Sequence, residues 1–131
     1  MLLIAVLLAG CQSKSATGET VAVTGGSYQN ITPAELITML KYKDFVFINV
    51  HVPFAGNIAE TDLSIAYDQI TNPASLAQLP ADKNAKIILY CRSGRMSQMA
   101  AEDLVKLGYT NIWNLNGGMV GQERAGYEIE N

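Results

Sequence analysis

The stretch AKIILYCRSGRMSQMAAEDLVKLG, residues 85–108, combines the patterns of a buried strand, a short loop and a helix. Residues 85–91 form an apolar run that is too short for a helix and apolar on both faces, as in a buried strand. Residues 97–108 carry apolar side chains at helical spacing and end at Gly108, a typical helix terminator. A strand that enters a helix through a short loop is a building unit of parallel sheets.

The rest of the chain continues this alternation of strand and helix. A helix is predicted after Thr32, because Pro33 suits the first helical position and Glu35 completes a capping box. The alternation predicts an α/β sandwich of three layers, in which a mostly parallel sheet is covered by helices on both faces. The other expected elements are a buried strand at 44–50, a short helix within 71–79, a strand at 111–115 and a glycine turn at 117–118.

Length and composition indicate one globular domain. The chain has 131 residues, of which 49% are hydrophobic and 16% are charged, a balance that favours a packed core over disorder. The net charge of −3 disfavours a nucleic acid as the main partner.

The N-terminal stretch MLLIAVLLAGC, residues 1–11, is apolar but too short to span a bilayer. It resembles the lipobox of bacterial lipoprotein signal peptides, although no Lys or Arg precedes Cys11. The resemblance implies lipidation of Cys11, export, and anchoring to a bacterial membrane, with the protein facing the periplasm or the cell exterior. The alternative is a soluble protein with an apolar N-terminus. Residues 12–27, rich in Ser, Thr and Gly, are predicted to be a flexible tether, and residues 28–131 the folded domain.

The loop from Cys91 to Met96 has the composition of an anion-binding cradle. A loop that curls from a strand end into a helix start directs backbone N–H groups inward, and the helix dipole adds positive potential. Arg92 and Arg95 raise this potential further, and Gly94 permits the positive φ of a tight curl. All of these features favour a thiolate at Cys91 and predict a nucleophile beside a site for a small oxyanion.

The segment YCRSGRMSQMAAEDLVKLGYTNIWNLNGGM, residues 90–119, resembles the active-site half of a rhodanese domain. Like that family, it has an apolar strand, Cys-Arg-x-Gly, an alanine-rich helix, LGY, an aromatic-bearing strand and a Gly-Gly turn. The sequence departs from the family elsewhere. Asn49, His51, Asn57 and Gln122 stand where rhodaneses usually have Asp, Arg, His and Trp.

The resemblance implies a thiosulfate sulfurtransferase-like enzyme in which Cys91 carries sulfur as a persulfide. Sulfur passes from an anionic donor such as thiosulfate to a thiol, cyanide or protein acceptor, with no metal or organic cofactor. A loop of six residues suits a sulfur atom, whereas related phosphatases use a longer loop that ends in Arg, where this chain has Ser97. Residues expected to bind substrate are Arg92, Ser93, Gly94, Arg95, Met96 and Ser97, and Asn49 and His51 are expected at the pocket rim.

Two other functions remain open at this point. The departures at Asn49 and His51 fit a non-catalytic rhodanese module that binds a partner or an anion. Alternatively, the domain is a persulfide carrier that hands sulfur to a partner protein. An inert, buried Cys91 is the structural alternative to a nucleophile, and a hydrogen-bonded loop residue is the alternative to a catalytic base at His51.

Overall fold

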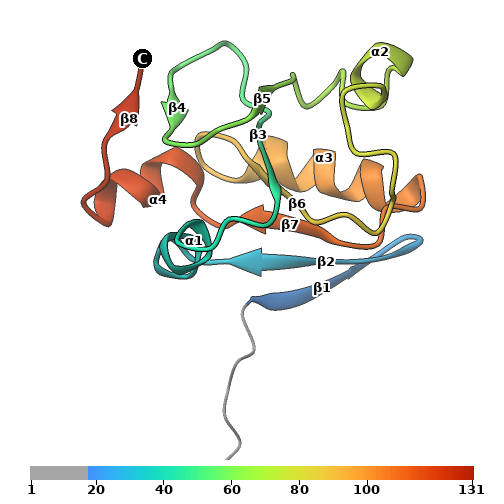
Figure 1. Cartoon of the computed structure of the whole chain (residues 1–131), viewed down its shortest axis with the longest axis horizontal. Helices are drawn as coiled ribbons and strands as arrows, with labels where there is room; N and C mark the ends of the chain where they lie inside the picture. Colours follow the sequence, from blue (N-terminus) through green and yellow to red (C-terminus); the bar gives the residue numbers. More distant parts are fainter. Residues whose placement is uncertain (1–17) are drawn as a thin grey trace, which may run out of the picture.

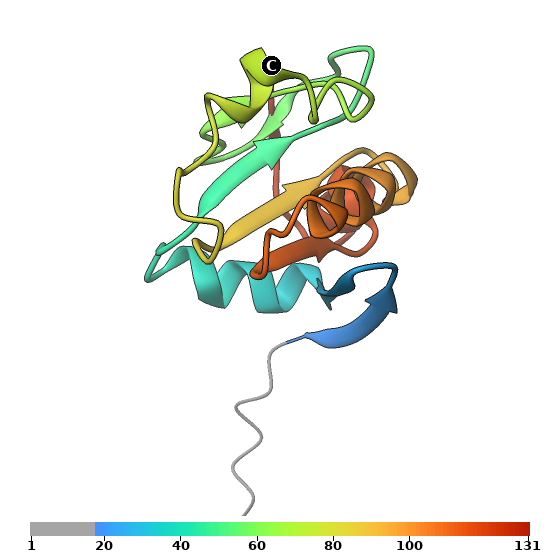
Figure 2. The same ribbon diagram turned by 90° about the vertical axis from the view of Figure 1, so that its right-hand side faces the viewer.

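Six strands form one sheet in the computed structural model, which describes residues 18–131 (Figure 1). Every neighbouring pair in this sheet is parallel except β1 and β2. Figure 2 shows β3, β6, β7 and β1 one above another. In spatial order the strands are β1 (Glu19–Val23), β2 (Gly26–Ile31), β7 (Ile112–Leu115), β6 (Ile87–Tyr90), β3 (Val46–Asn49) and β5 (Leu63–Ser64). An antiparallel pair, β4 (Asn57–Ile58) and β8 (Ile129–Glu130), lies apart from this sheet.

Helices cover both faces of the sheet, which confirms the three-layer α/β prediction. They are α1 (Pro33–Leu40), α2 (Pro73–Leu76), α3 (Arg95–Lys106) and α4 (Gly118–Arg124). Strand β6 divides its side chains between the two faces because successive residues of a strand point to opposite sides. Leu89 packs in the cluster that contains Leu104 of α3, whereas Tyr90 packs with Leu36 of α1 and Met119 of α4.

The capping box predicted at Thr32 is confirmed. The Thr32 hydroxyl accepts a hydrogen bond from the Glu35 amide at 3.2 Å, and the Glu35 carboxylate accepts one from the Thr32 amide at 3.1 Å. These two bonds satisfy amides that a helix start leaves without partners inside the helix. The strands and helices that the sequence predicts around Cys91 are also present.

The predicted tether boundary is wrong. Residues 19–23 and 26–27, expected to be part of a flexible tether at 12–27, belong to β1 and β2. Val21 and Val23 pack against the core, and Val21 pairs with Tyr28 in register. β-Branched residues such as these valines favour a strand. The strand was not predicted because the Gly, Ser and Thr around the valines are typical of a flexible linker. Cys11 and the rest of residues 1–17 lie outside the described part of the chain. Within residues 18–131, no helix has the length and apolar character needed for a bilayer span.

Helix α4 occupies a place where the sequence predicts only a glycine turn. Gly117 is its N-cap with φ +80°, and Gly118 is its first residue with φ +54°. The chain therefore turns at the two glycines, as expected, and then continues directly into a helix. This helix contacts α1 and β4, and its first turn holds the loop that carries Cys91.

Candidate active site

Cys91 directly follows β6, at the carboxyl edge of the parallel sheet and just before α3. The loop that follows curls back, and Gly94, with φ +117°, is the N-cap of α3. The Gly94 amide donates a hydrogen bond to Cys91 Sγ at 2.9 Å. The Ser97 hydroxyl lies 3.4 Å from the same sulfur and 3.1 Å from the Gly94 carbonyl. The sulfur thus lies at the positive end of α3 with N–H and O–H donors beside it.

The start of α4 fixes the orientation of this loop. The Met119 amide donates to the Cys91 carbonyl at 2.9 Å, and the Val120 amide donates to the Arg92 carbonyl at 3.0 Å. Both carbonyls are therefore engaged on the α4 side. These bonds use amides that a helix start leaves free, so two helix N-termini, those of α3 and α4, hold the loop together.

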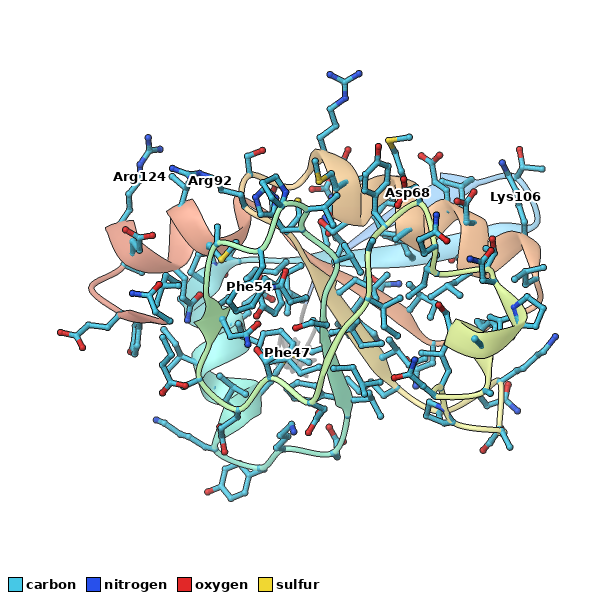
Figure 3. The ribbon with its side chains drawn as sticks, turned by 90° about the horizontal axis from the view of Figure 1, so that it is seen from above. Phe47, Phe54, Asp68, Arg92, Lys106 and Arg124 are labelled. Atoms are coloured by element: carbon cyan, nitrogen blue, oxygen red, sulfur yellow. The ribbon has the colours of Figure 1, made fainter. Side chains whose placement is uncertain are left out.

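The six residues expected to bind substrate divide into a buried and an exposed set. Gly94 and Ser97 are buried beside the sulfur, and Met96 is half-buried and packs against the core. Three side chains lie on the outside of the loop: Arg92, Ser93 and Arg95 are exposed. Figure 3 looks down on the molecule and shows Arg92 projecting at the same end as Arg124 of α4. The loop therefore has polar donors inside and positive charge outside.

Cys91 itself is 1% exposed, and Leu89 and Ala100 belong to the apolar cluster that surrounds it. A thiolate buried without donors would be costly, but the Gly94 amide and the Ser97 hydroxyl provide such donors here. The burial has a chemical consequence. A reagent must be slender, or the loop must open slightly, for an atom to reach Sγ.

Asn49 lies in the interior rather than at the expected pocket rim. It is 2% exposed. Its amide nitrogen donates to the Gly56 carbonyl and to Asn57 Oδ1, both at 2.9 Å, and its oxygen accepts from the His51 amide at 3.0 Å. The side chain thus satisfies polar groups of the 51–57 loop that would otherwise be buried without partners. Asn49 therefore holds this loop beside the active site and does not line the rim.

Tyr90 extends the same network, and sequence reasoning missed it. Its hydroxyl accepts from the Ile58 amide at 3.0 Å and lies 2.7 Å from Thr61 Oγ1 and 3.3 Å from Asn57 Oδ1. Burial raises the pKa of Tyr90 above its ordinary value, against the lowering effect of its hydrogen bonds to Thr61 and Ile58. The phenol therefore stays neutral and anchors the segment after β4 to the strand that leads into Cys91.

His51 is half-buried next to the positive loop. Burial lowers the pKa of His51 from its ordinary value of 6.5, and the nearby charge of Arg92 lowers it further. Both effects disfavour imidazolium, because burial removes water from the charged form and a like charge repels it. His51 is therefore neutral at pH 7 and carries no positive charge toward an anionic donor, unlike the Arg that rhodaneses usually have there.

We expect an NMR titration of His51 to show a midpoint below 6.5. The chain has a single histidine, so its ring resonances are unambiguous. Arg92→Gln removes the repelling charge and is expected to raise the midpoint. Because the folded pKa lies below the unfolded one, the folded state binds fewer protons, and stability is expected to fall as the pH drops below about 6.5. Equal midpoints in the wild-type protein and Arg92→Gln would contradict this placement of the two side chains.

The family model that matches the sequence is the rhodanese-like domain, over residues 43–125. The match includes β3, the Cys91 loop and α4, and it covers more than half of the chain. The chain belongs to the rhodanese-like domain family. The resemblance read from residues 90–119 is confirmed at the level of the family and of the fold.

Known rhodanese-like and related proteins match over different parts of the chain. A sulfurtransferase of Allochromatium vinosum is 35% identical over 57 residues, 44% of this chain and 51% of that protein. The tRNA uridine(34) hydroxylase of Enterobacter sp. is 28% identical over 99 residues, 72% of this chain and 28% of that enzyme. This chain thus spans about half, or less, of the length of these two curated relatives. The crystal structure of a rhodanese-related protein from Thermoplasma volcanium, 26% identical, matches with a TM-score of 0.63 over 78% of this chain and 97% of that one.

Several residues that shape the site were not found by sequence reasoning. The amides of Met119 and Val120 reach the loop from α4, and Tyr90 and Thr61 hold the segment after β4. A tyrosine at the end of a buried apolar strand was an available signal, since its hydroxyl needs a partner in the interior. The contacts from α4 gave no such signal, because they depend on backbone atoms.

Proposed function

We propose that this rhodanese-like domain is a sulfurtransferase that carries sulfur on Cys91. In the first step, the Cys91 thiolate attacks the outer sulfur of a thiosulfate-like donor. The S–S bond of the donor breaks, and sulfite leaves with the bonding electron pair. Cys91 then holds a persulfide. In the second step, cyanide or a thiolate attacks the terminal sulfur, and Cys91 leaves as the thiolate. Both steps exchange one bond to sulfur for another, so no external oxidant or reductant is consumed.

The observation that carries this proposal is the 2.9 Å hydrogen bond from the Gly94 amide to Cys91 Sγ. An N–H donor stabilises the thiolate more than the thiol, because hydrogen bonds to ionised groups are stronger. The Ser97 hydroxyl and the N-terminus of α3 act in the same direction. These groups favour a nucleophile at Cys91 over the inert, buried cysteine that its 1% exposure alone would indicate.

The exposed arginines supply the attraction for the donor. Arg92 and Arg95 are exposed on the outside of the loop, and a thiosulfate dianion is drawn to positive charge. The neutral His51 contributes no positive charge. We therefore propose that donor recognition depends on the two arginines and the loop amides alone, which limits the site to small anionic donors.

Turnover assays test the proposal and separate it from the alternatives. The full chain is incubated with thiosulfate and either cyanide or a dithiol, and thiocyanate or sulfide is measured over time. A sulfurtransferase releases product with at least one of the two acceptors. A persulfide carrier takes up one sulfur per chain but turns over with neither small acceptor. A binding module takes up no sulfur and releases no product, and this result would overturn the proposal.

We also propose that the protein is exported and attached to a membrane through a lipid on Cys11. The proposal rests on the stretch LAGC at residues 8–11. Palmitate labelling in a bacterial host is expected to mark the wild-type protein and to leave Cys11→Ser unlabelled. Wild-type protein should sediment with membranes, because the acyl chains attached to Cys11 anchor it stably. Cys11→Ser has no site for these chains and should stay in the supernatant. Equal membrane binding of both would contradict the assignment.

A further inference from the structure

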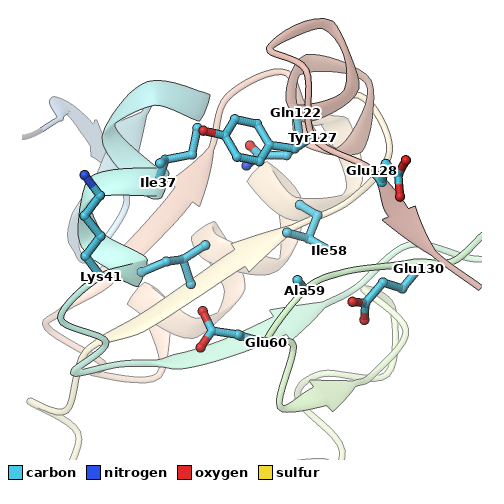
Figure 4. A pocket seen from close by; sticks show the side chains of 10 residues that line it. Ile37, Lys41, Ile58, Ala59, Glu60, Gln122, Tyr127, Glu128 and Glu130 are labelled. Carbon is cyan, nitrogen blue, oxygen red and sulfur yellow. The ribbon is translucent and has the colours of Figure 1, made fainter.

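A pocket lies between α1, the turn after β4 and the C-terminal segment. Its volume is about 460 Å³, within the range of small-molecule sites. Cys91 and the loop that follows it do not line this pocket. Its apolar walls come from Ile37 and Leu40 of α1, Ile58 of β4 and Tyr127 (Figure 4). Ile58 is 3% exposed and forms part of the floor, so a ligand seated here contacts the core directly.

Gln122 provides the polar group of this pocket. Its side chain is 1% exposed and lines the pocket from α4, next to Tyr127 (Figure 4). Among residues 18–131, no hydrogen-bond donor reaches its buried oxygen, Oε1. An unpaired buried carbonyl oxygen destabilises a fold, and nearly all such atoms in proteins have partners. A ligand with an N–H group would supply the missing donor.

The rim of the pocket is acidic. Glu60, Glu128 and Glu130 line it, and all three are exposed at its edge. Lys41 is the one basic residue of the lining, and Figure 4 shows its ammonium directed away from the Glu60 carboxylate.

We propose that this pocket binds a small organic ammonium whose apolar body packs against Ile37, Ile58 and Tyr127. A rotation of the Gln122 side chain turns Oε1 from the interior into the pocket, where the ammonium donates a hydrogen bond to it, and the three rim carboxylates attract its positive charge. A carboxylate ligand lacks the N–H donor and is repelled by the rim. A neutral alcohol of the same shape supplies a donor but no charge, so it binds more weakly than the amine.

Phenethylamine, 2-phenylethanol and 3-phenylpropionate are suitable probes, because they share one apolar body and differ in the polar group. Each is titrated into isotope-labelled full chain while the NMR signals of Ile58, Ile37 and the Gln122 side-chain amide are followed. Phenethylamine is expected to shift these signals most strongly, 2-phenylethanol less, and 3-phenylpropionate not at all. No shift with phenethylamine up to millimolar concentration, or equal shifts with all three compounds, would overturn the proposal.

Substitutions at the pocket give a second, independent measurement. Gln122→Leu keeps the volume but removes the acceptor, so phenethylamine affinity is expected to fall about fivefold while the melting temperature stays the same or rises. Gln78→Leu, the same change at an exposed position, is the matched control and should leave affinity unchanged. Glu60→Gln should weaken phenethylamine and spare 2-phenylethanol. Unchanged affinity in Gln122→Leu would contradict the role of Oε1. Sulfur-transfer turnover reports on Cys91 separately, so the two proposals fail independently.

Discussion

Cys91→Ser is expected to lower sulfur-transfer turnover by about 10³-fold or more, because the residue that accepts the sulfur is lost. A serine hydroxyl is far less acidic than a thiol and does not attack a sulfane sulfur at neutral pH. The two side chains are close in size, so the hydrogen bond from the Gly94 amide can be kept and the fold should remain intact. Steady-state turnover measures the loss of activity, and the far-UV circular dichroism spectrum shows whether the fold is intact.

The matched control for this change is Cys11→Ser, the same substitution at the other cysteine. In detergent, where membrane attachment does not limit the assay, Cys11→Ser is expected to keep wild-type turnover. Residual turnover above a few per cent in a well-folded Cys91→Ser variant would mean that another group carries the sulfur.

Gly118→Ala is expected to disable the active site and to lower the stability of the fold by roughly 3 kcal/mol or more. A Cβ at this position would collide with the carbonyl oxygen of Cys91 and would lie 2.7 Å from that of Arg92. The atoms it meets are backbone, so they cannot turn aside as a flexible side chain would. Relief requires α4 to move away from the loop, and this breaks the bonds from Met119 and Val120.

Gly126→Ala is the control that separates this contact from backbone strain. Gly126 also has a positive φ, +95°, but a Cβ there would meet nothing within 4 Å. The Gly126→Ala variant should therefore lose only about 1–2 kcal/mol of its free energy of unfolding, the cost of a left-handed conformation for alanine. Its turnover should be unchanged. Urea denaturation gives the free energies of unfolding. Equal destabilisation of the two variants, or full turnover in Gly118→Ala, would contradict the close approach of α4 to the Cys91 loop.

The parts of the fold that sequence reasoning found are those with strong local signals. The capping box at Thr32 and Glu35 is set by residues three apart in the chain. The buried strand before Cys91 and the helix after it follow from hydrophobic periodicity. Strand β1 was missed because Gly, Ser and Thr surround its valines, and its stability depends on pairing with β2. Helix α4 was missed because it is short and starts at glycine, a weak helix former.

The same distinction applies to the candidate site. The placement of Cys91 between a strand and a helix, with arginines on the outside of the loop, could be read from the sequence. The role of Asn49 could not, because its partners Gly56 and Asn57 come close to it only when the 51–57 loop folds back. The hydrogen bonds from α4 to the loop could not be predicted either, because they join backbone atoms that are far apart in the sequence. Motif spacing therefore identified Cys91 as the candidate nucleophile, and the structure identified the side chains and backbone amides that hold its loop in place.

The mass of the tryptic peptide 87–92, which contains Cys91 and ends at Arg92, shows whether Cys91 carries the transferred sulfur. The full chain is treated with thiosulfate, digested without reductant, and compared with an untreated sample. We expect this peptide to gain one sulfur atom and cyanide to remove it again. An unchanged mass, or an added sulfur found only on the peptide that carries Cys11, would contradict it.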